Sequence, residues 1–457
     1  MKNQSLLSIL ISAMMLITSL TMAQEKDKFV SESEYLKDFQ LADDILIPYR
    51  VGDLFGYCDK DKNIIISPQW TDAFPFKQGV AAVAKTFDDG QFYALINRKG
   101  ELLTDYDYKE IMPFDENGLG RVFGRSLQWG ALNTKGEEQI PIGFRTLYYK
   151  STGVYIAEYE GKYGIIDENA KTLLPFEFDK LSLCYDGDSY RAVKNGKVGY
   201  LDKDFSPITD FIYTSIGLDP GFRSGMAVVN LDGKNLVINN KGETIFDGSE
   251  YKDLTVAGDD LIVVSLDISK SVDWMEFYES SAGLFKISTN EMIIDPKKMK
   301  YAGIGSLYTK PELFDVFGLK RGSKHGIIDR KGNILLDSEF DRIYITQKNN
   351  GVLQLIKKID RSVDECELYF IENNQKSTFI PGKLFSFSSK NNIPFLVINH
   401  NSNNLHGIID LFGKTVIENK YHKLPVDTQF FIEDGLLQVY KNDKHYYVSF
   451  NGNEFVQ

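Results

Sequence analysis

Cysteine and histidine are scarce in this sequence, which leaves little material for a metal or redox centre. The 457 residues include three Cys and five His. The cysteines, Cys58, Cys184 and Cys366, are odd in number and far apart, so they provide no disulfide framework. We expect them to be buried free thiols that pack as small apolar side chains. A zinc site needs several convergent ligands, and no metal or other cofactor is predicted.

Positive charge is also in short supply. Lys and Arg total 52 against 64 Asp and Glu, which gives a formal net charge of -12. Nucleic acid and anionic lipid both bind basic faces, so a general affinity for either is not expected. Hydrophobic residues make up 43% of the chain and charged residues 25%, as in ordinary folded proteins. The acidic balance favours a basic or neutral partner.

Long apolar runs are absent except at the amino terminus, where residues 1–23 predict a secretory signal peptide. Lys2 supplies the positive region, the stretch from Leu6 to Leu20 is apolar apart from Ser and Thr, and Gln24 is the expected mature start. The stretch is short for a membrane span of about 20 residues, so an uncleaved anchor is the less favoured alternative. No Cys stands near the cleavage point. We expect a periplasmic or extracellular protein without a lipid anchor or a membrane span, which begins with a polar lead-in, residues 24–45.

An internal repeat governs the rest of the chain. Aromatic residues make up 13% and Gly numbers 37, a composition that favours strands and tight turns. One pattern recurs, in which a bulky residue, Gly and two apolar residues precede Asp, as in residues 55–59 and 163–167. Self-similarity of this kind decides the fold. Including looser copies, the Asp position falls at residues 59, 97, 133, 167, 202, 239, 286, 329, 372, 410 and 449.

Each copy predicts one turn and one hairpin. An Asx side chain at the first turn position can bond the backbone two residues on, and Gly three residues later suits a type I turn or bulge. The dipeptides Glu160-Gly161, Asn195-Gly196 and Asp232-Gly233 predict tight hairpins, because both hairpin positions need positive φ. Each copy is therefore expected to be a three-stranded antiparallel meander followed by a short link.

The repeat resembles the WG-repeat (WG-containing repeat) family, whose units contain Trp-Gly, two apolar residues, Asp, a turn with Gly and a Pro-terminated strand. Trp129-Gly130 is the literal Trp-Gly pair, and segments 68–74 and 78–81 match the link and first strand of the family. In other copies the Trp place is taken by Phe55, Tyr163, Val198, His325 and His406. The resemblance covers about residues 46–455 and is poorest from 247 to 323. It implies repeated β structure in exported or surface proteins, and no shared catalytic residue.

Short meanders cannot bury both faces alone, so neighbouring units must stack. We expect an all-β tandem array of about eleven three-stranded units that is open and curved or superhelical. One or two β-propeller-like rings are the alternative, with a division near residue 250; a single propeller typically has about four to eight blades. The predicted regions are regular repeats over 46–250, irregular longer repeats with inserted loops over 251–323, and C-terminal repeats over 324–457 with a truncated last unit.

Positions in the repeat explain the histidines and carboxylates better than a catalytic or metal-binding role does. His325 and His406 occupy the Trp place, where a planar ring packs against the next unit. His400, His422 and His445 show no HxH or HxxxH spacing. The recurring Asp residues are explained as a set by turn chemistry. No G-x-S-x-G or P-loop motif occurs, so no catalytic, cofactor-binding or metal-binding residue is nominated.

The sequence predicts an exported, non-catalytic repeat protein that presents a binding surface to a protein partner or polysaccharide of the cell envelope. Aromatic side chains such as Trp70 and Trp274 can stack on a glycan, although packing between units accounts for most of them. Trp274 lies in the irregular stretch 272–277, outside the repeated positions, and a core or loop-anchoring role is favoured for it too. Two alternatives stay open. One is a propeller-type glycan-active enzyme with two carboxylates about 5–10 Å apart, and the other is a structural envelope spacer.

Overall fold

A computed structural model describes most of the repeat region. The described residues are 41–150, 153–214, 221–258, 260–266, 282–296, 303–306, 316–321, 323–345, 352–358, 364–370, 375–376, 380–381, 383–388, 394–400, 405–410, 415–422, 424, 435–441, 444–450 and 452–457. The predicted signal peptide, most of the predicted lead-in, and Trp274 with its neighbours lie outside these residues.

Within the described residues the chain is all β, and its strands fall into eleven units that follow the eleven sequence copies. Units 1 to 4 are β1 (Ile47–Val51), β2 (Leu54–Cys58) and β3 (Ile64–Trp70); β4 (Asp72–Ala73), β5 (Val80–Phe87) and β6 (Gly90–Asn97); β7 (Tyr108–Ile111), β8 (Leu119–Gly124), β9 (Trp129–Asn133) and β10 (Glu138–Phe144); and β11 (Thr146–Lys150), β12 (Val154–Tyr159), β13 (Lys162–Asp167) and β14 (Thr172–Phe178). Units 5 to 7 are β15 (Lys180–Leu183), β16 (Tyr190–Lys194) and β17 (Lys197–Leu201); β18 (Met226–Leu231), β19 (Lys234–Asn239) and β20 (Thr244–Asp247); and β21 (Asp253–Gly258), β22 (Leu261–Ser265), β23 (Ala282–Lys286) and β24 (Glu291–Ile294). Units 8 and 9 are β25 (Gly303–Ser306), β26 (Val316–Arg321), β27 (Lys324–Asp329) and β28 (Ile334–Phe340); and β29 (Arg342–Ile345), β30 (Val352–Lys358), β31 (Asp364–Phe370), β32 (Gln375–Lys376) and β33 (Ile380–Pro381). Units 10 and 11 are β34 (Lys383–Ser388), β35 (Pro394–His400), β36 (Leu405–Asp410) and β37 (Thr415–Tyr421); and β38 (Leu436–Lys441), β39 (Lys444–Ser449) and β40 (Glu454–Phe455).

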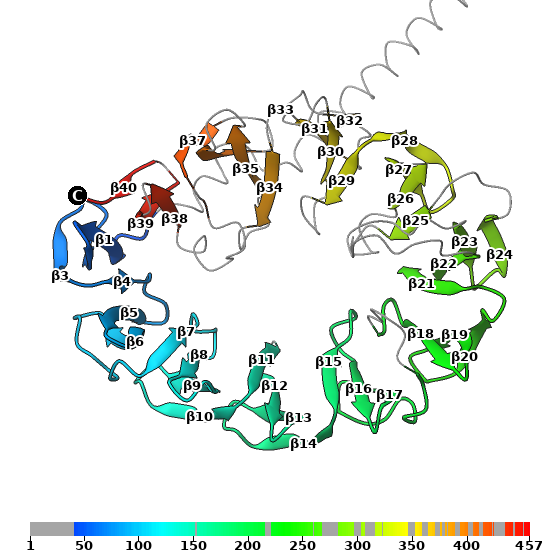
Figure 1. The fold of residues 1–457 in the computed structure, drawn as a ribbon, viewed down its shortest axis with the longest axis horizontal. Helices are drawn as coiled ribbons and strands as arrows, with labels where there is room; N and C mark the ends of the chain where they lie inside the picture. The colour runs from blue at the N-terminus through cyan, green and yellow to red at the C-terminus, as the bar shows by residue number, and fades with distance from the viewer. Residues whose placement is uncertain are drawn as a thin grey trace, which may run out of the picture.

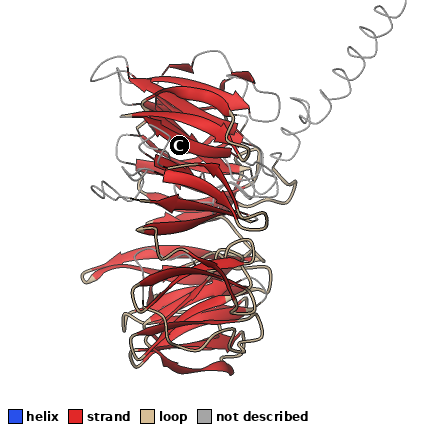
Figure 2. Ribbon diagram, turned by 90° about the vertical axis from the view of Figure 1, so that its right-hand side faces the viewer, coloured by secondary structure: helices blue, strands red, loops and turns tan. Residues whose placement is uncertain are grey.

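The units stand side by side like the blades of a propeller (Figure 1). In the four-stranded sheets the first strand lies toward the centre and the last at the perimeter, as β11 and β14 of unit 4 show. The antiparallel meander is confirmed. The link expected between meanders is itself the innermost strand of the following sheet, for example β15 of unit 5, which pairs with β16. The strands run across the thickness of the ring, so the turns lie on its two faces (Figure 2).

The predicted turn chemistry is confirmed at the Asp position. In unit 4, Asp167 Oδ1 accepts hydrogen bonds from the N–H groups of Asn169 and Lys171, both at 2.9 Å. Ala170, in the place where other copies have Gly, has a φ of 60°. The same pair of side-chain bonds is made by Asp59, Asn97, Asn133, Asp202, Asn239 and Asp329. The hairpins follow their prediction too, with φ of 53° at Asn195 and 75° at Gly196.

The Gly of the repeat pattern is required by the strand that follows it. In unit 1, Phe55 pairs with Trp70 and Tyr57 pairs with Ile66, so a bulge bends β3 over the intervening Gly56. A Cβ on Gly56 would lie 2.2 Å from the carbonyl oxygen of Ile66. The corresponding distances are 2.8 Å at Gly164 and 2.5 Å at Gly326. The motif glycine therefore permits a close backbone approach that a larger residue prevents.

Hydrophobic cores lie between units rather than within them. Ile165 and Leu174 of unit 4, for example, pack with Leu181 and Tyr190 of unit 5 in one buried cluster. Equivalent clusters span the junctions from unit 2 round to unit 9, and from unit 10 to unit 11. The junction of units 6 and 7, near residue 250, is one of them. The array is therefore continuous near residue 250, where the two-ring alternative places a division.

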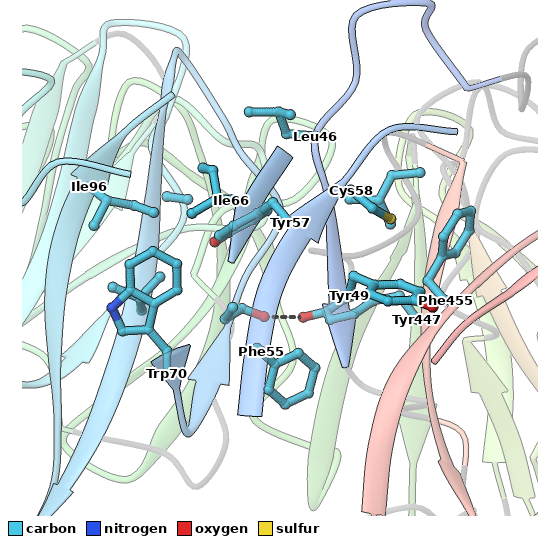
Figure 3. Packing of buried hydrophobic residues seen from close by; sticks show 14 of the residues in the cluster. Leu46, Tyr49, Phe55, Tyr57, Cys58, Ile66, Trp70, Ile96, Tyr447 and Phe455 are labelled. Atoms are coloured by element: carbon cyan, nitrogen blue, oxygen red, sulfur yellow. Dashed lines mark hydrogen bonds between the residues drawn. The ribbon is translucent and has the colours of Figure 1, made fainter. Parts of the chain in front are cut away.

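The two ends of the repeat array meet. Leu436, Tyr447 and Phe455 of unit 11 share a core cluster with residues of units 1 and 2, and Figure 3 shows Tyr447 and Phe455 beside Tyr49 of unit 1. Arg50 forms a parallel bridge with Val456, and its carbonyl accepts a 2.8 Å hydrogen bond from the Gln457 N–H. The arrangement is thus a single closed ring, which is the propeller-like alternative to the open array.

Candidate functional site

Among the described residues, a group of hydrogen-bonded titratable side chains lies at the seam, where units 11, 1 and 2 meet. Its centre is Asp72 on β4, the innermost strand of unit 2. Asp72 Oδ1 accepts hydrogen bonds from the Ala73 N–H at 2.8 Å and from Nε2 of His445 at 2.9 Å. The other oxygen accepts from the Tyr93 hydroxyl at 3.3 Å. A nearly buried carboxylate is satisfied in this way by three donors from three strands.

His445 is held by two aromatic rings as well as by Asp72. Its ring stacks on Phe55 of unit 1 at a centroid distance of 5.0 Å and an interplanar angle of 23°. Tyr440 on β38 lies against it at 5.7 Å. Because a carboxylate oxygen only accepts hydrogen bonds, Nε2 of His445 carries the proton toward Asp72. The side chain is 19% exposed, so part of the imidazole still faces solvent.

Tyrosine hydroxyls complete the seam. Burial, and then the nearby Asp72 carboxylate, raise the pKa of Tyr57, Tyr93 and Tyr447. These phenols therefore stay protonated and act as donors. The Tyr57 hydroxyl donates to the Phe74 carbonyl at 2.8 Å, and the Tyr447 hydroxyl donates to the Ala73 carbonyl at 3.1 Å.

Asp72, His445 and their partners at the seam are suited to closing the ring. An Asp–His pair is the orienting part of a hydrolase triad, which also needs a nucleophile. Among the described residues, no Ser, Thr or Cys side chain hydrogen-bonds to His445 or Asp72. At the same seam Arg50 donates to the His445 carbonyl at 3.1 Å, and Lys444 pairs with Asp53 at 2.6 Å. The His445–Asp72, Arg50–His445 and Lys444–Asp53 contacts each join unit 11 to unit 1 or unit 2.

The other histidines are dispersed around the ring. His325 on β27 is buried and pairs with Phe340 across the strands. His406 on β36 pairs with Tyr421 in the same manner. His422 is exposed and its N–H donates to the Tyr440 carbonyl, while His400 ends β35 with its side chain outside the described part. Sequence reasoning did not place His445 in the repeat, although it stands four residues before Ser449, in the Trp place of unit 11.

Carboxylates outside the turns mostly tie one unit to the next. Lys162 of unit 4 pairs with Asp179 at the start of unit 5 at 2.6 Å. Lys324 and Asp341 make the same contact at 2.9 Å between units 8 and 9. Asp253 on β21 has a different environment, because burial raises the pKa of its carboxyl group. Its Oδ1 accepts a 3.0 Å bond from the Leu254 N–H.

The cysteines and Trp70 belong to the cores. Cys58 and Cys184 are buried thiols, as predicted, and the Cys366 side chain lies outside the described part. Burial, reinforced by Asp59, raises the pKa of the Cys58 thiol to about 12. Trp70 is buried and its Nε1 donates to the Tyr106 hydroxyl at 2.9 Å.

Among the described residues, no three His, Cys, Asp or Glu side chains converge in a way that would hold a metal ion. Nor does this part of the chain contain a helix of the length and apolarity that a membrane span needs.

Comparison with known proteins identifies the repeat. The model of the family described as "WG containing repeat" matches residues 55–86, 93–123, 163–197, 199–234 and 326–352. No curated protein matches the chain in sequence.

Among solved structures, a crystal structure titled as the eukaryotic initiation factor is 12% identical, with a TM-score of 0.44, and covers 74% of this chain and 96% of its own. The C-terminal WD40 domain of Sif2 is 9% identical, with a TM-score of 0.30, and covers 89% and 96%. Hsv2 of Kluyveromyces lactis is 8% identical, with a TM-score of 0.30, and covers 58% and 94%. The closed ring of β units follows from the strand pairing and cores of this chain itself.

Proposed function

Since this chain is a WG-repeat protein, we propose that it acts as an exported, rigid and non-catalytic ring that presents a binding surface to a protein partner or a polysaccharide of the cell envelope. The observation that carries the proposal is the series of cores between neighbouring units from unit 2 to unit 9, together with the core that joins unit 11 to units 1 and 2 at the seam. A ring held in this way keeps surface side chains of many units in fixed relative positions, and pre-organisation of that kind favours binding.

The chemistry of the described residues supports binding over catalysis. The recurring Asp and Asn side chains are engaged in turns, as Asp167 is by two backbone N–H groups. Asp179 and Asp341 are engaged in ion pairs between units. Export is supported by residues 1–23, whose charged start, apolar stretch and small residues match a secretory signal.

The test is a cross-linking pull-down of tagged mature protein from its native envelope fraction, with parallel samples digested by protease or by polysaccharide hydrolases. We expect a specific partner, protein or glycan, that is lost after one digestion and kept after the other. Recovery of no partner, or release of new reducing ends from envelope polysaccharide by the purified protein, would overturn the proposal. The second result would establish the glycan-active enzyme instead. Fractionation and amino-terminal sequencing check export, which fails if Met1 is retained on cytoplasmic protein.

A further inference from the structure

One face of the ring exposes large apolar side chains on three consecutive units. They lie at the hairpins that connect β5 to β6, β8 to β9 and β12 to β13. The exposed fractions are 41% for Phe87, 56% for Leu127 and 45% for Tyr159. Because consecutive strands of each meander run in opposite directions, the same hairpin of each unit lies on the same face of the ring, so these side chains share a face. The equivalent hairpin of unit 5, residues 194–197, reads Lys-Asn-Gly-Lys.

The side chains of units 2 and 3 are joined by direct contacts. Phe87 packs on Phe92 at a centroid distance of 6.1 Å. Arg125, from the hairpin that carries Leu127, lies 3.5 Å over the Phe92 ring and pairs with Asp89 at 2.8 Å. The two hairpins therefore form one surface.

The surface continues from unit 3 to unit 4. Gln128, next to Leu127, donates a 3.0 Å hydrogen bond to the Gly143 carbonyl. The adjacent Phe144 packs on Tyr159 at 6.0 Å, and both contact Phe176, at 6.1 and 5.9 Å. We call these side chains together the hairpin surface. It consists of Phe87, Leu127 and Tyr159, with the half-buried Phe144 and Phe176 next to them.

Around the hairpin surface, the charge that has no ion pair among the described residues is mainly negative, with Lys85, 5.3 Å over the Tyr106 ring, as a cation beside it. Its arginines are already engaged, Arg125 with Asp89 and Asp107, and Arg145 with Glu158. Three exposed carboxylates have no ion pair among the described residues: Asp88 and Glu160 in the hairpins themselves, and Asp105, two residues before the Asp107 that pairs with Arg125. Exposed apolar side chains gathered on one face with such a rim are typical of a protein interaction site.

We propose that the hairpin surface binds a segment of another protein in which apolar side chains alternate with Lys or Arg. The apolar side chains would cover Phe87, Leu127 and Tyr159, and the cations would pair with the free carboxylates. A second copy of this chain fits poorly, because it carries the same net charge of -12. A polysaccharide fits less well than a protein, since stacking on sugars uses aromatic faces and leaves Leu127 without a role. The inference rests on the proposed binding function and narrows it to one partner class and one face.

The experiment places a photo-crosslinking benzoylphenylalanine at position 127 of the full mature chain. The matched control places it at position 65, because Ile65 is also 56% exposed but lies on the outer strand β3. Both proteins are irradiated in the native envelope fraction, and adducts are mapped by mass spectrometry. We expect a protein adduct at 127 that is absent at 65, mapped to a segment with apolar residues flanked by Lys or Arg.

The mapped segment, made as a synthetic peptide, then serves as the probe. We expect Phe87→Ala and Tyr159→Ala each to weaken its binding about tenfold and Ile65→Ala to leave it unchanged, with affinity falling as salt rises. A protein adduct at 65 but not at 127 would overturn this surface and leave the binding function standing. A glycan, lipid, acidic segment or second copy at 127 would overturn the proposed partner. If no adduct forms at either position and no partner is recovered in the pull-down, both proposals fail.

Discussion

At the scale of single residues, the motif glycine sets the path of the outermost strand. The bulge in the fourth strand of unit 4 places the Leu174 carbonyl oxygen 2.8 Å from where a Gly164 Cβ would stand. A methyl group at that position must push the strand outward and break its register with β13. Nothing of this kind surrounds Gly143 on β10, where an added Cβ meets no atom within 4 Å.

Gly164→Ala is therefore expected to destabilise the ring by about 1–3 kcal/mol, while Gly143→Ala stays close to neutral. Urea denaturation followed by tyrosine and tryptophan fluorescence measures both variants against the parent. Equal stability of the two variants would show that the fourth strand adjusts freely, and the explanation of the motif glycine would be lost.

Asp253 supplies a pH-dependent test at the same scale. Burial raises the pKa of its carboxyl group in the folded state, so folding favours the protonated form. The stability this provides is full below the unfolded pKa of about 3.9 and is lost as the pH rises through the folded pKa. At pH 7 the carboxylate is buried at a cost that Asp253→Asn removes, while the amide oxygen still accepts from the Leu254 N–H.

We expect Asp253→Asn to raise the melting temperature at pH 7 and to leave it unchanged near pH 3.5, as measured by differential scanning calorimetry. For each protein, the melting temperature near pH 3.5 is the control for the melting temperature at pH 7. A gain of the same size at both pH values would point to packing rather than to the charge.

At the scale of the structural element, the turn after the third strand depends on one side-chain oxygen. Asp167 bonds two backbone N–H groups, and Asn97, Asn133 and Asn239 do the same in other units. An amide oxygen thus replaces a carboxylate oxygen within this chain. Asp167→Asn should be tolerated, whereas Asp167→Ala should cost about 1 kcal/mol. Thermal unfolding by circular dichroism compares the two, and an equal loss in both would assign the effect to charge.

Local elements of this kind are what a sequence can reveal. The turns, the tight hairpins and the eleven units were predicted because each depends on residues that are close in the chain. The innermost strand of a sheet was not predicted. It is formed by the link between two meanders, which pairs with the following unit, as Leu181 does with Ala192. The hairpin surface was also missed. Its apolar tips, Phe87, Leu127 and Tyr159, differ from unit to unit and therefore fall outside any repeated pattern.

At the scale of the whole molecule, closure depends on contacts that local spacing cannot predict. His445 and Asp72 are 373 residues apart, and neither stands out from its own copy of the repeat. An open array and a ring share the same units and the same junctions, so they differ only at the seam. Closure joins unit 11 to units 1 and 2 through one shared core, which adds to the rigidity that the proposed binding function needs.

The seam can be opened selectively. Asp72→Ala removes the acceptor for the Ala73 N–H, His445 and Tyr93 together, and leaves those donors without a partner in a nearly buried site. We expect a loss of about 1–3 kcal/mol and faster hydrogen exchange in β1 and β39, with β12 and β13 unchanged. His445→Ala should act on the same segments, and the double variant should add little, because both residues belong to one network.

The control for the seam is Asp179→Ala, which removes an ion pair at the ordinary junction between units 4 and 5. It should raise exchange only around that junction and leave β1 and β39 protected. If Asp72→Ala instead raised hydrogen exchange in all units alike, the seam would not differ from the other junctions between units. If it changed no segment, the backbone bridge of Arg50 to Val456 and the shared core would hold the ring without the Asp72–His445 contact.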